Sequence, residues 1–150
     1  MEPLDFRPAT ADDLPALVGL LADDALGAAR ESLDDLAPYA SAYRDIEEDP
    51  HQQLLVAERE GTVVGTLQLT VIPGLSHRGS ARAQIEAVRI AASERGTGLG
   101  TQMIDWAVDE SRRQGCRIVQ LTSDASRTDA HRFYERLGFK ATHVGFKLTL

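Results

Sequence analysis

Apolar residues early in the chain recur at the spacing of a helix. Leu14, Leu17, Val18 and Leu21 lie three or four positions apart, which predicts an amphipathic helix. The segment 10–13 before them reads TADD and resembles a capping box with Asp in place of Glu. A first helix is therefore expected to begin shortly after position 10.

The rest of the chain switches between alternating and helical patterns. The alternating segments predict strands at 2–9, 53–59, 62–72, 81–90, 116–123 and 139–149, the fifth of them buried and the last a strand or strand pair. The helical segments predict helices at about 33–48, 98–114 and 129–137. Residues 73–80 are expected to form a loop.

Turn residues support the limits of these elements. Glu60-Gly61 is a hairpin signal, and Gly115 and Gly138 are suited to ending helices. A helix also has to stop before Pro50, because the residue that precedes a proline avoids the helical region. The predicted order is β-α-α-β-β-β-α-β-α-β, in one α/β (α+β) domain over residues 1–150 with a mixed sheet.

Composition and charge narrow the class of protein. A chain of 150 residues with 43% hydrophobic and 26% charged residues can bury a core without disulfides. The net charge of −7 argues against a nucleic-acid partner, which requires a basic face. Residues 1–75 carry 15 acidic and 4 basic side chains, whereas residues 76–150 carry 8 and 12, so the two halves suit partners of opposite charge.

The location is expected to be cytoplasmic. Cys116 is the one cysteine, which fits a reducing compartment. No signal sequence or membrane-spanning stretch is recognisable, so no membrane partner is expected. The four histidines and Cys116 lack the spacing of metal ligands, so no metal is expected either.

A glycine-rich segment carries the clearest chemical signal. Residues 95–100 read RGTGLG between a predicted strand and a predicted helix. Glycines let a ligand approach the backbone closely, and a helix N-terminus favours an anion. A diphosphate would suit this loop, with Arg95 adding a positive charge.

Two other phosphate-binding loops differ from this segment. A Walker A loop requires a Lys after its last glycine, where this chain has Thr101. A dinucleotide-binding loop requires G-x-G-x-x-G directly after a strand, whereas the spacing here is G-x-G-x-G after five intervening residues. A glycine-rich turn without a ligand stays open as the simplest alternative.

Two segments together resemble one known family. The segment 95–100, after a strand ending in Val88 and Ile90, is similar to the acetyl-CoA-binding motif of the GNAT superfamily of acyl-CoA-dependent N-acyltransferases. Residues 130–139 (AHRFYERLGF) resemble the second signature of that family, a Tyr-bearing helix followed by Leu-Gly-Phe. The resemblance implies a mostly antiparallel sheet flanked by helices and covers the whole chain.

The resemblance implies transfer of an acetyl group from acetyl-CoA to a primary amine in a ternary complex. Acetyl-CoA is then a co-substrate: the loop holds its diphosphate, and the end of the fourth strand pairs with its pantetheine arm. A backbone N–H near Val88 would stabilise the oxyanion. The residues implied for cofactor binding are Val88, Arg89, Ile90, Arg95, Gly96, Thr97, Gly98, Leu99, Gly100 and Thr101.

Two catalytic roles follow from the resemblance. A base is required because an alkyl amine with a pKa of ~10 is mostly protonated at neutral pH. The resemblance makes Glu86, two residues before Val88, the candidate for this base, acting directly or through water. Tyr134 is the candidate acid for the departing CoA thiolate, and it lies on a predicted buried stripe of its helix. Their alternatives are a half-exposed strand carboxylate and a core tyrosine.

One position departs from the family pattern. The usual Asn of an Asn-x-x-Ala segment is replaced by Arg127. Arg127 is included among the cofactor-binding candidates as a partner for a CoA phosphate, and it could also meet an acidic acceptor. Its alternative is a loop arginine paired with Asp124 or Asp129.

The acceptor is expected to bind residues 22–49 and 73–82. The resemblance places the pocket there, and this region is rich in acidic side chains, which would suit a cationic amine, either a small molecule or a peptide. Solvated helix faces are the alternative for these charges. A catalytically silent acyl-CoA-binding sensor or partner domain is the alternative function, and an exposed edge on the last strand would permit a homodimer.

Overall fold

The computed structural model describes residues 3–150, which form two compact units, one up to Gln120 and one spanning Leu121–Leu150. Each unit is described by itself. The expectation of one domain over residues 1–150 stays a prediction. In the part of the chain that the structure describes, no helix combines the length and apolar character that a membrane span requires.

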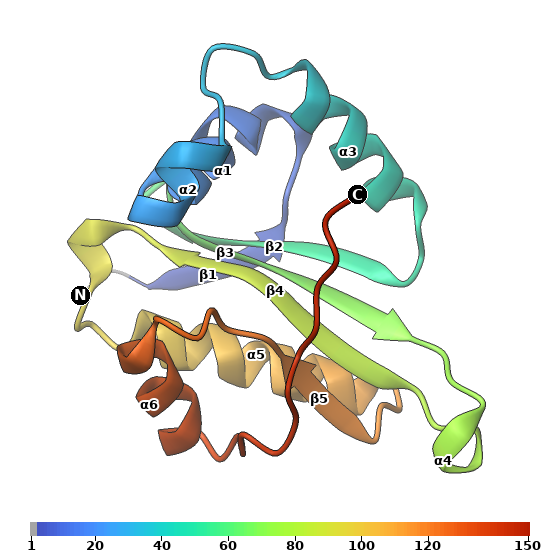
Figure 1. Cartoon of the computed structure of the whole chain (residues 1–150). Coiled ribbons are helices and arrows are strands. Elements are labelled where there is room, and N and C mark those ends of the chain that lie inside the picture. The colour runs from blue at the N-terminus through green and yellow to red at the C-terminus, as the bar shows by residue number, and fades with distance from the viewer. Residues whose placement is uncertain (1–2) are drawn as a thin grey trace. The chain divides into compact units, whose positions relative to one another are not determined.

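The first unit contains most of the regular elements (Figure 1). Its helices are η1 (Ala11–Asp13), α1 (Leu14–Ala22), α2 (Ala25–Arg30), α3 (Ala37–Glu48), α4 (Ser76–Gly79), η2 (Ala92–Glu94) and α5 (Leu99–Arg113). Its strands are β1 (Leu4–Pro8), β2 (Gln52–Arg59), β3 (Thr62–Ile72) and β4 (Arg82–Ile90), and β5 (Ile118–Leu121) reaches the boundary. The second unit contains α6 (Thr128–Arg136).

The strands form one five-stranded sheet in the order β1-β2-β3-β4-β5. The pairs β1–β2, β2–β3 and β3–β4 are antiparallel. The β2–β3 hairpin turns at Glu60 and Gly61, whose φ angles of 51° and 75° are both left-handed, as a tight two-residue hairpin requires. The predicted hairpin at these two residues is confirmed.

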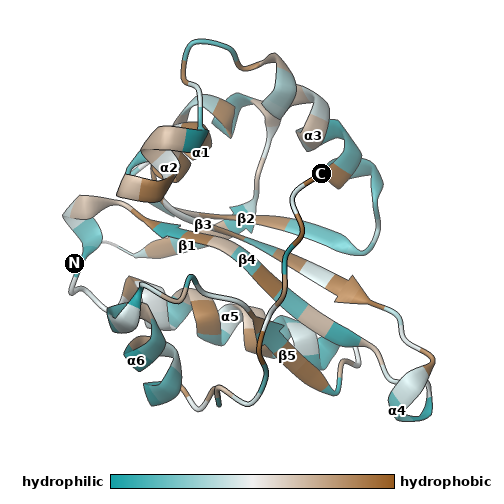
Figure 2. Ribbon diagram, in the orientation of Figure 1, coloured by the Kyte–Doolittle hydropathy of each residue, from teal (hydrophilic) through white to brown (hydrophobic). Residues whose placement is uncertain are grey.

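Helices cover both faces of this sheet (Figure 1). Alternation along each strand sends one set of side chains toward α5 and the other toward α1 and α3. Leu67, Leu69 and Ile85 are almost fully buried, as are Met103 and Ile104 of α5. Figure 2 shows apolar residues concentrated along the central strands, where this core lies.

The ladder between β3 and β4 is interrupted by a β-bulge. Gln68 pairs with Glu86 and Thr66 with Arg89, so two residues of β4 lie opposite one residue of β3. Ala87 in this bulge has a left-handed φ of 52°, which is uncommon for a residue with a side chain. The bulge changes which residues of β4 face each layer of helices.

Several predicted elements are shorter than expected or were missed. The helix expected at 33–48 begins at Ala37, and it ends before Pro50 as predicted. The short helix α2, whose first turn is capped by the Asp24 carboxylate accepting from the Gly27 N–H, was not predicted. The loop at 73–80 contains the single turn α4. Glu2, the first residue of the predicted strand 2–9, lies outside the described residues.

Two strand predictions need correction. The strand expected at 116–123 is limited to β5, and Ile118 is 52% exposed, so it is not a buried strand. No strand forms in the described residues 139–150. Val144, Phe146 and Leu148 alternate as a strand would, yet all three are exposed, and Figure 2 shows the same alternation along the trace. Alternation alone predicts a strand only where a neighbouring strand can pair with it.

A half-buried ion pair fixes the start of α1. Arg7 of β1 donates to both oxygens of the Asp13 carboxylate at 2.7 and 2.9 Å and to Glu58 of β2 at 2.6 Å. The Thr10 N–H donates to Asp13 at 2.7 Å, which confirms the predicted capping box. Hydrogen bonds from Arg7 lower the pKa of Asp13 from 3.8 to about 2.

Replacement of Asp13 by Asn is expected to lower the free energy of unfolding at pH 7 by about 2 kcal/mol. The folded-state pKa lies below the unfolded value, so this contribution is present above pH 3.8 and is lost as the pH falls toward 2. Urea unfolding at several pH values measures it. Asp12→Asn, at the exposed neighbouring residue, is the control. A deficit of the same size at every pH would contradict the assignment.

Candidate active site

The glycine loop lies between η2 and α5 and has a backbone that requires glycine. Gly96 and Gly98 have left-handed φ angles of 77° and 86°. A Cβ built at either position would meet no atom of the described chain within 4 Å, so the restriction comes from the backbone and the space beside it is open. Helix α5 begins at Leu99, and its first N–H groups have no acceptor within the helix.

A buried carboxylate anchors this loop to the sheet. Glu94 of η2 is only 9% exposed and accepts from Arg59 of β2, with Arg59 Nε at 2.9 Å. The Thr97 hydroxyl donates to the Glu94 carbonyl oxygen at 2.7 Å and lies 3.1 Å from its carboxylate. Hydrogen bonds from Arg59 lower the pKa of Glu94. Arg59 and Glu94 were not predicted from the sequence, because their separation along the chain gives no local signal.

The remaining cofactor-binding candidates of β4 lie around the bulge and after it. Val88 is one of the two bulge residues of β4 that lie opposite a single residue of β3, and Ile90 pairs with Gly65. Arg89 Nε lies 3.2 Å from the Asp24 carboxylate at the start of α2, and Arg89 Nη1 donates to the Val88 carbonyl at 2.9 Å. Arg89 therefore connects β4 to α2.

The candidate base Glu86 lies on the face of the sheet that α1 and α3 cover. It is exposed, and its carboxylate accepts from the Gln84 amide at 2.5 Å. The side-chain oxygen of Gln84 in turn accepts from the side-chain amide of Gln120 in β5 at 2.9 Å. This chain of side chains holds the Glu86 carboxylate in one orientation, and Gln84 was not singled out by the sequence.

The second unit contains Tyr134 and Arg127. The Tyr134 ring makes edge contacts with Phe133 and Phe139, with centroids 5.1 and 5.8 Å away. No residue of α6 is fully buried. The stripe predicted to be buried is only half-buried, and it consists of Ala130, Phe133, Tyr134 and Leu137.

Arg127 is the residue immediately before α6. Its charge contributes to lowering the pKa of Asp124, although hydrogen bonds from Ser126 are the larger cause. His131 lies 2.8 Å from the Asp124 carbonyl oxygen through its Nε2. The ion pair of Asp129 is formed with Arg132.

Acidic residues of the predicted acceptor region have local partners. Asp24 caps α2, Glu31 accepts from the Tyr39 hydroxyl, and Glu47 accepts from the Tyr43 hydroxyl. These carboxylates are held by neighbouring groups.

Comparison with known proteins identifies similar chains. Residues 17–139 match the model of the acetyltransferase (GNAT) family. The aminoalkylphosphonate N-acetyltransferase of Salmonella typhimurium is 34% identical over 102 residues, which cover 68% of this chain and 66% of that protein. The glucosamine 6-phosphate N-acetyltransferase of Trypanosoma brucei brucei is 37% identical over 90 residues, covering 60% and 59%. The chain thus matches less than two thirds of the length of these curated relatives.

A solved structure is similar over nearly the whole chain. The crystal structure of a transcriptional regulator from Bacillus halodurans C-125 has a TM-score of 0.95 and 43% identity, covering 99% of this chain and 100% of that one. The family match confirms the predicted resemblance. The similarity of structure confirms the predicted fold class of a mostly antiparallel sheet flanked by helices.

Replacement of Glu94 by Gln is expected to loosen the glycine loop. Gln keeps the shape of the side chain but removes the charge that Arg59 neutralises, and it weakens the hydrogen bonds that hold Thr97. Amide hydrogen exchange in residues 95–98 should become several-fold faster. Asp105→Asn, which removes an exposed charge from α5, is the control and should leave this exchange unchanged. Equal exchange in Glu94→Gln and the unaltered protein would refute the anchoring role.

Proposed function

Because the chain belongs to the acetyltransferase (GNAT) family, we propose that it transfers an acetyl group from acetyl-CoA to a primary amine. The observation that carries this proposal is the bulged strand β4, followed through η2 by an open glycine loop at the start of the 15-residue helix α5. This arrangement supports an anion site at the N-terminus of α5, beyond a strand whose middle carries the carboxylate of Glu86.

The residues of the loop fit the diphosphate of acetyl-CoA. Backbone N–H groups of Gly96 and of Gly98 to Thr101 lie at or just before the N-terminus of α5, where the helix dipole favours a negative charge, whereas the Thr97 N–H donates to the Glu94 carbonyl oxygen. The side chain of Arg95 is exposed and adds a positive charge. Arg127 is proposed as a further phosphate partner on the basis of its position in the family motif.

The end of β4 fits the extended pantetheine arm. Hydrogen bonds join the region of β5 to the beginning of β4. The Arg117 N–H donates to the Ala81 carbonyl oxygen, and the Gln120 side chain donates to the Gln84 side chain. Residues Val88 to Ile90 lie at the opposite end of β4, where a ligand can pair with the backbone as an added strand does. The N–H of Val88, a residue of the bulge, is the proposed oxyanion donor.

Glu86 is proposed as the general base. An ammonium group with a pKa of ~10 has to lose a proton before its nitrogen can attack. Glu86 accepts that proton, directly or through water, the nitrogen forms a bond to the acetyl carbon, and the carbon–sulfur bond breaks. Gln84 is a positioning residue in this scheme, because its amide donates to the Glu86 carboxylate.

Tyr134 is proposed as the acid that protonates the departing thiolate. Its support is the family motif in residues 130–139. Within the second unit, Phe133 and Phe139 pack against its ring and restrict its orientation.

Amines are the proposed acceptors. The relatives from Salmonella typhimurium and Trypanosoma brucei brucei are named for N-acetylation of an aminoalkylphosphonate and of glucosamine 6-phosphate, which supports an amine acceptor here. A cationic acceptor, a homodimer and a cytoplasmic location stay predictions.

A second candidate function is a catalytically silent acyl-CoA-binding sensor or partner domain. The observation that favours it is the description of the similar Bacillus halodurans structure as a transcriptional regulator. The two functions differ in turnover, because a silent domain binds acetyl-CoA without releasing CoA thiol when amines are added.

The test is thiol release from acetyl-CoA with a panel of primary amines. Glu86→Gln and Tyr134→Phe should each lower kcat by roughly 10²- to 10⁴-fold, the usual range for loss of an acid or base. Calorimetric affinity for acetyl-CoA should be retained in both. Asp105→Asn, at an exposed residue of α5 outside the proposed acceptor and cofactor sites, is the control for charge removal and should keep full activity.

Unchanged kcat in both variants would show that the catalytic roles are assigned to the wrong residues. Binding of acetyl-CoA without thiol release for any amine would favour the silent domain. Failure to bind acetyl-CoA at all would reject both functions.

A further inference from the structure

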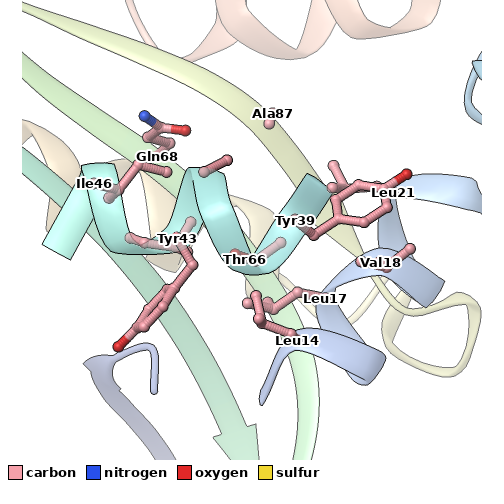
Figure 3. Close-up of a pocket in the computed structure, with 12 residues that line it drawn as sticks. Leu14, Leu17, Val18, Leu21, Tyr39, Tyr43, Ile46, Thr66, Gln68 and Ala87 are labelled. Carbon is pink, nitrogen blue, oxygen red and sulfur yellow. The ribbon is translucent and has the colours of Figure 1, made fainter. Parts of the chain in front are cut away.

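An apolar cavity of ≈ 190 Å³ lies between α1, α3 and the sheet (Figure 3). Leu17, Val18 and Leu21 line it from α1, and Tyr39, Ala42 and Ile46 line it from α3. Its floor is formed by the strands, including Ala87 of the β4 bulge. All of these residues belong to the first unit.

The two tyrosines of the cavity direct their hydroxyl groups to partners in the protein. The Tyr39 hydroxyl donates to Glu31 at 3.1 Å. The Tyr43 hydroxyl lies 3.3 Å from both the Ala9 carbonyl oxygen and Glu47. Their rings therefore contribute carbon surface to the cavity, and Figure 3 shows the Tyr43 hydroxyl at the end of its ring away from Gln68.

The polar side chains on the floor are also engaged. The Thr66 hydroxyl donates to the Leu55 carbonyl at 2.7 Å, and the Gln68 amide donates to Gln52 at 2.9 Å. A polar ligand group placed in this cavity would lose its bonds to water and would compete with bonds that already exist. The cavity therefore favours a carbon group over a polar one.

The cavity is adjacent to the candidate base. Ala87 lines it and directly follows Glu86 in the chain. Gln68 also lines it and is the cross-strand partner of Glu86, and such partners have Cβ atoms about 5 Å apart. A molecule whose nitrogen lies at Glu86 can thus reach the cavity through a short linker.

We infer that the amine acceptor carries an apolar group, about the size of a phenyl ring, which binds in this cavity. This inference rests on the proposed function. An apolar protein cavity of about 150 Å³ accepts benzene, so ≈ 190 Å³ accommodates a ring with its linker. The ammonium group would face the Glu86 carboxylate, and the ring would lie among Leu17, Leu21 and Tyr39. Acceptors with a polar or charged group in place of the ring would be disfavoured.

The first measurement compares phenethylamine with histamine, two ethylamines that differ in an apolar or a polar ring. Phenethylamine should have a kcat/KM at least about tenfold higher, since displacement of a polar group by a matching apolar group in such a pocket has effects of this size. Equal kcat/KM values, or a preference for histamine, would overturn the inference while leaving the acetyltransferase proposal intact.

The second measurement fills the cavity. Ala42 lines it but is exposed on α3, so Ala42→Leu adds volume at the mouth with little cost to the helix. Ser41→Leu, at the adjacent exposed residue that does not line the cavity, is the matched control. The preference for phenethylamine over histamine should disappear in Ala42→Leu and persist in Ser41→Leu. An unchanged preference in Ala42→Leu would overturn the inference.

Calorimetry separates failure of this inference from failure of the proposed function. If no amine releases thiol, the proposed function fails, and binding of the two amines without turnover decides the inference. Tighter binding of phenethylamine, lost in Ala42→Leu, would support an apolar site. Equal binding of the two amines, or no binding of either, would overturn it.

Discussion

The geometry of the candidate site depends on the extra residue in β4. Without the bulge, residues 84, 86, 88 and 90 would all face α1 and α3. The left-handed conformation of Ala87, which costs about 1–2 kcal/mol in a residue with a side chain, shifts this alternation by one position. Arg89 then turns to Asp24 at the start of α2, whereas Ile90 turns toward α5 with its partner Gly65. The long β2–β3–β4 ladders supply the pairing that holds this strain in place.

The two layers of helices perform separate tasks around this strand. Helix α5 packs against one face through Met103 and Ile104, and its N-terminus presents the glycine loop beyond the end of β4. Helices α1 and α3 stand off from the other face far enough to leave the apolar cavity. The strand between them carries Glu86 and Val88, so the proposed cofactor site at the loop and the proposed acceptor site in the cavity are both next to the same few residues of β4.

The sequence predicted the parts of this arrangement that depend on local chemistry. The hairpin at Glu60-Gly61, the Thr10–Asp13 capping box and the glycine loop all follow from residues close together in the chain. The Arg59–Glu94 pair joins residues 35 positions apart, and no local pattern reports such a pairing. Residues 139–149 show the opposite failure, because a correct alternating pattern has no pairing neighbour in the described structure.

The specificity for an acceptor depends on more than the count of acidic side chains. The first 75 residues carry a large excess of acidic side chains, which led to the expectation of a cationic acceptor. In the structure, Asp24 and Glu31 serve as a helix cap and as the acceptor for Tyr39, and the cavity beside Glu86 is lined by carbon. Any primary amine is already a cation at neutral pH, so a single carboxylate can meet its charge. Under the proposed function, discrimination among amines then depends on what the rest of the molecule contacts, and the cavity beside Glu86 offers it an apolar surface.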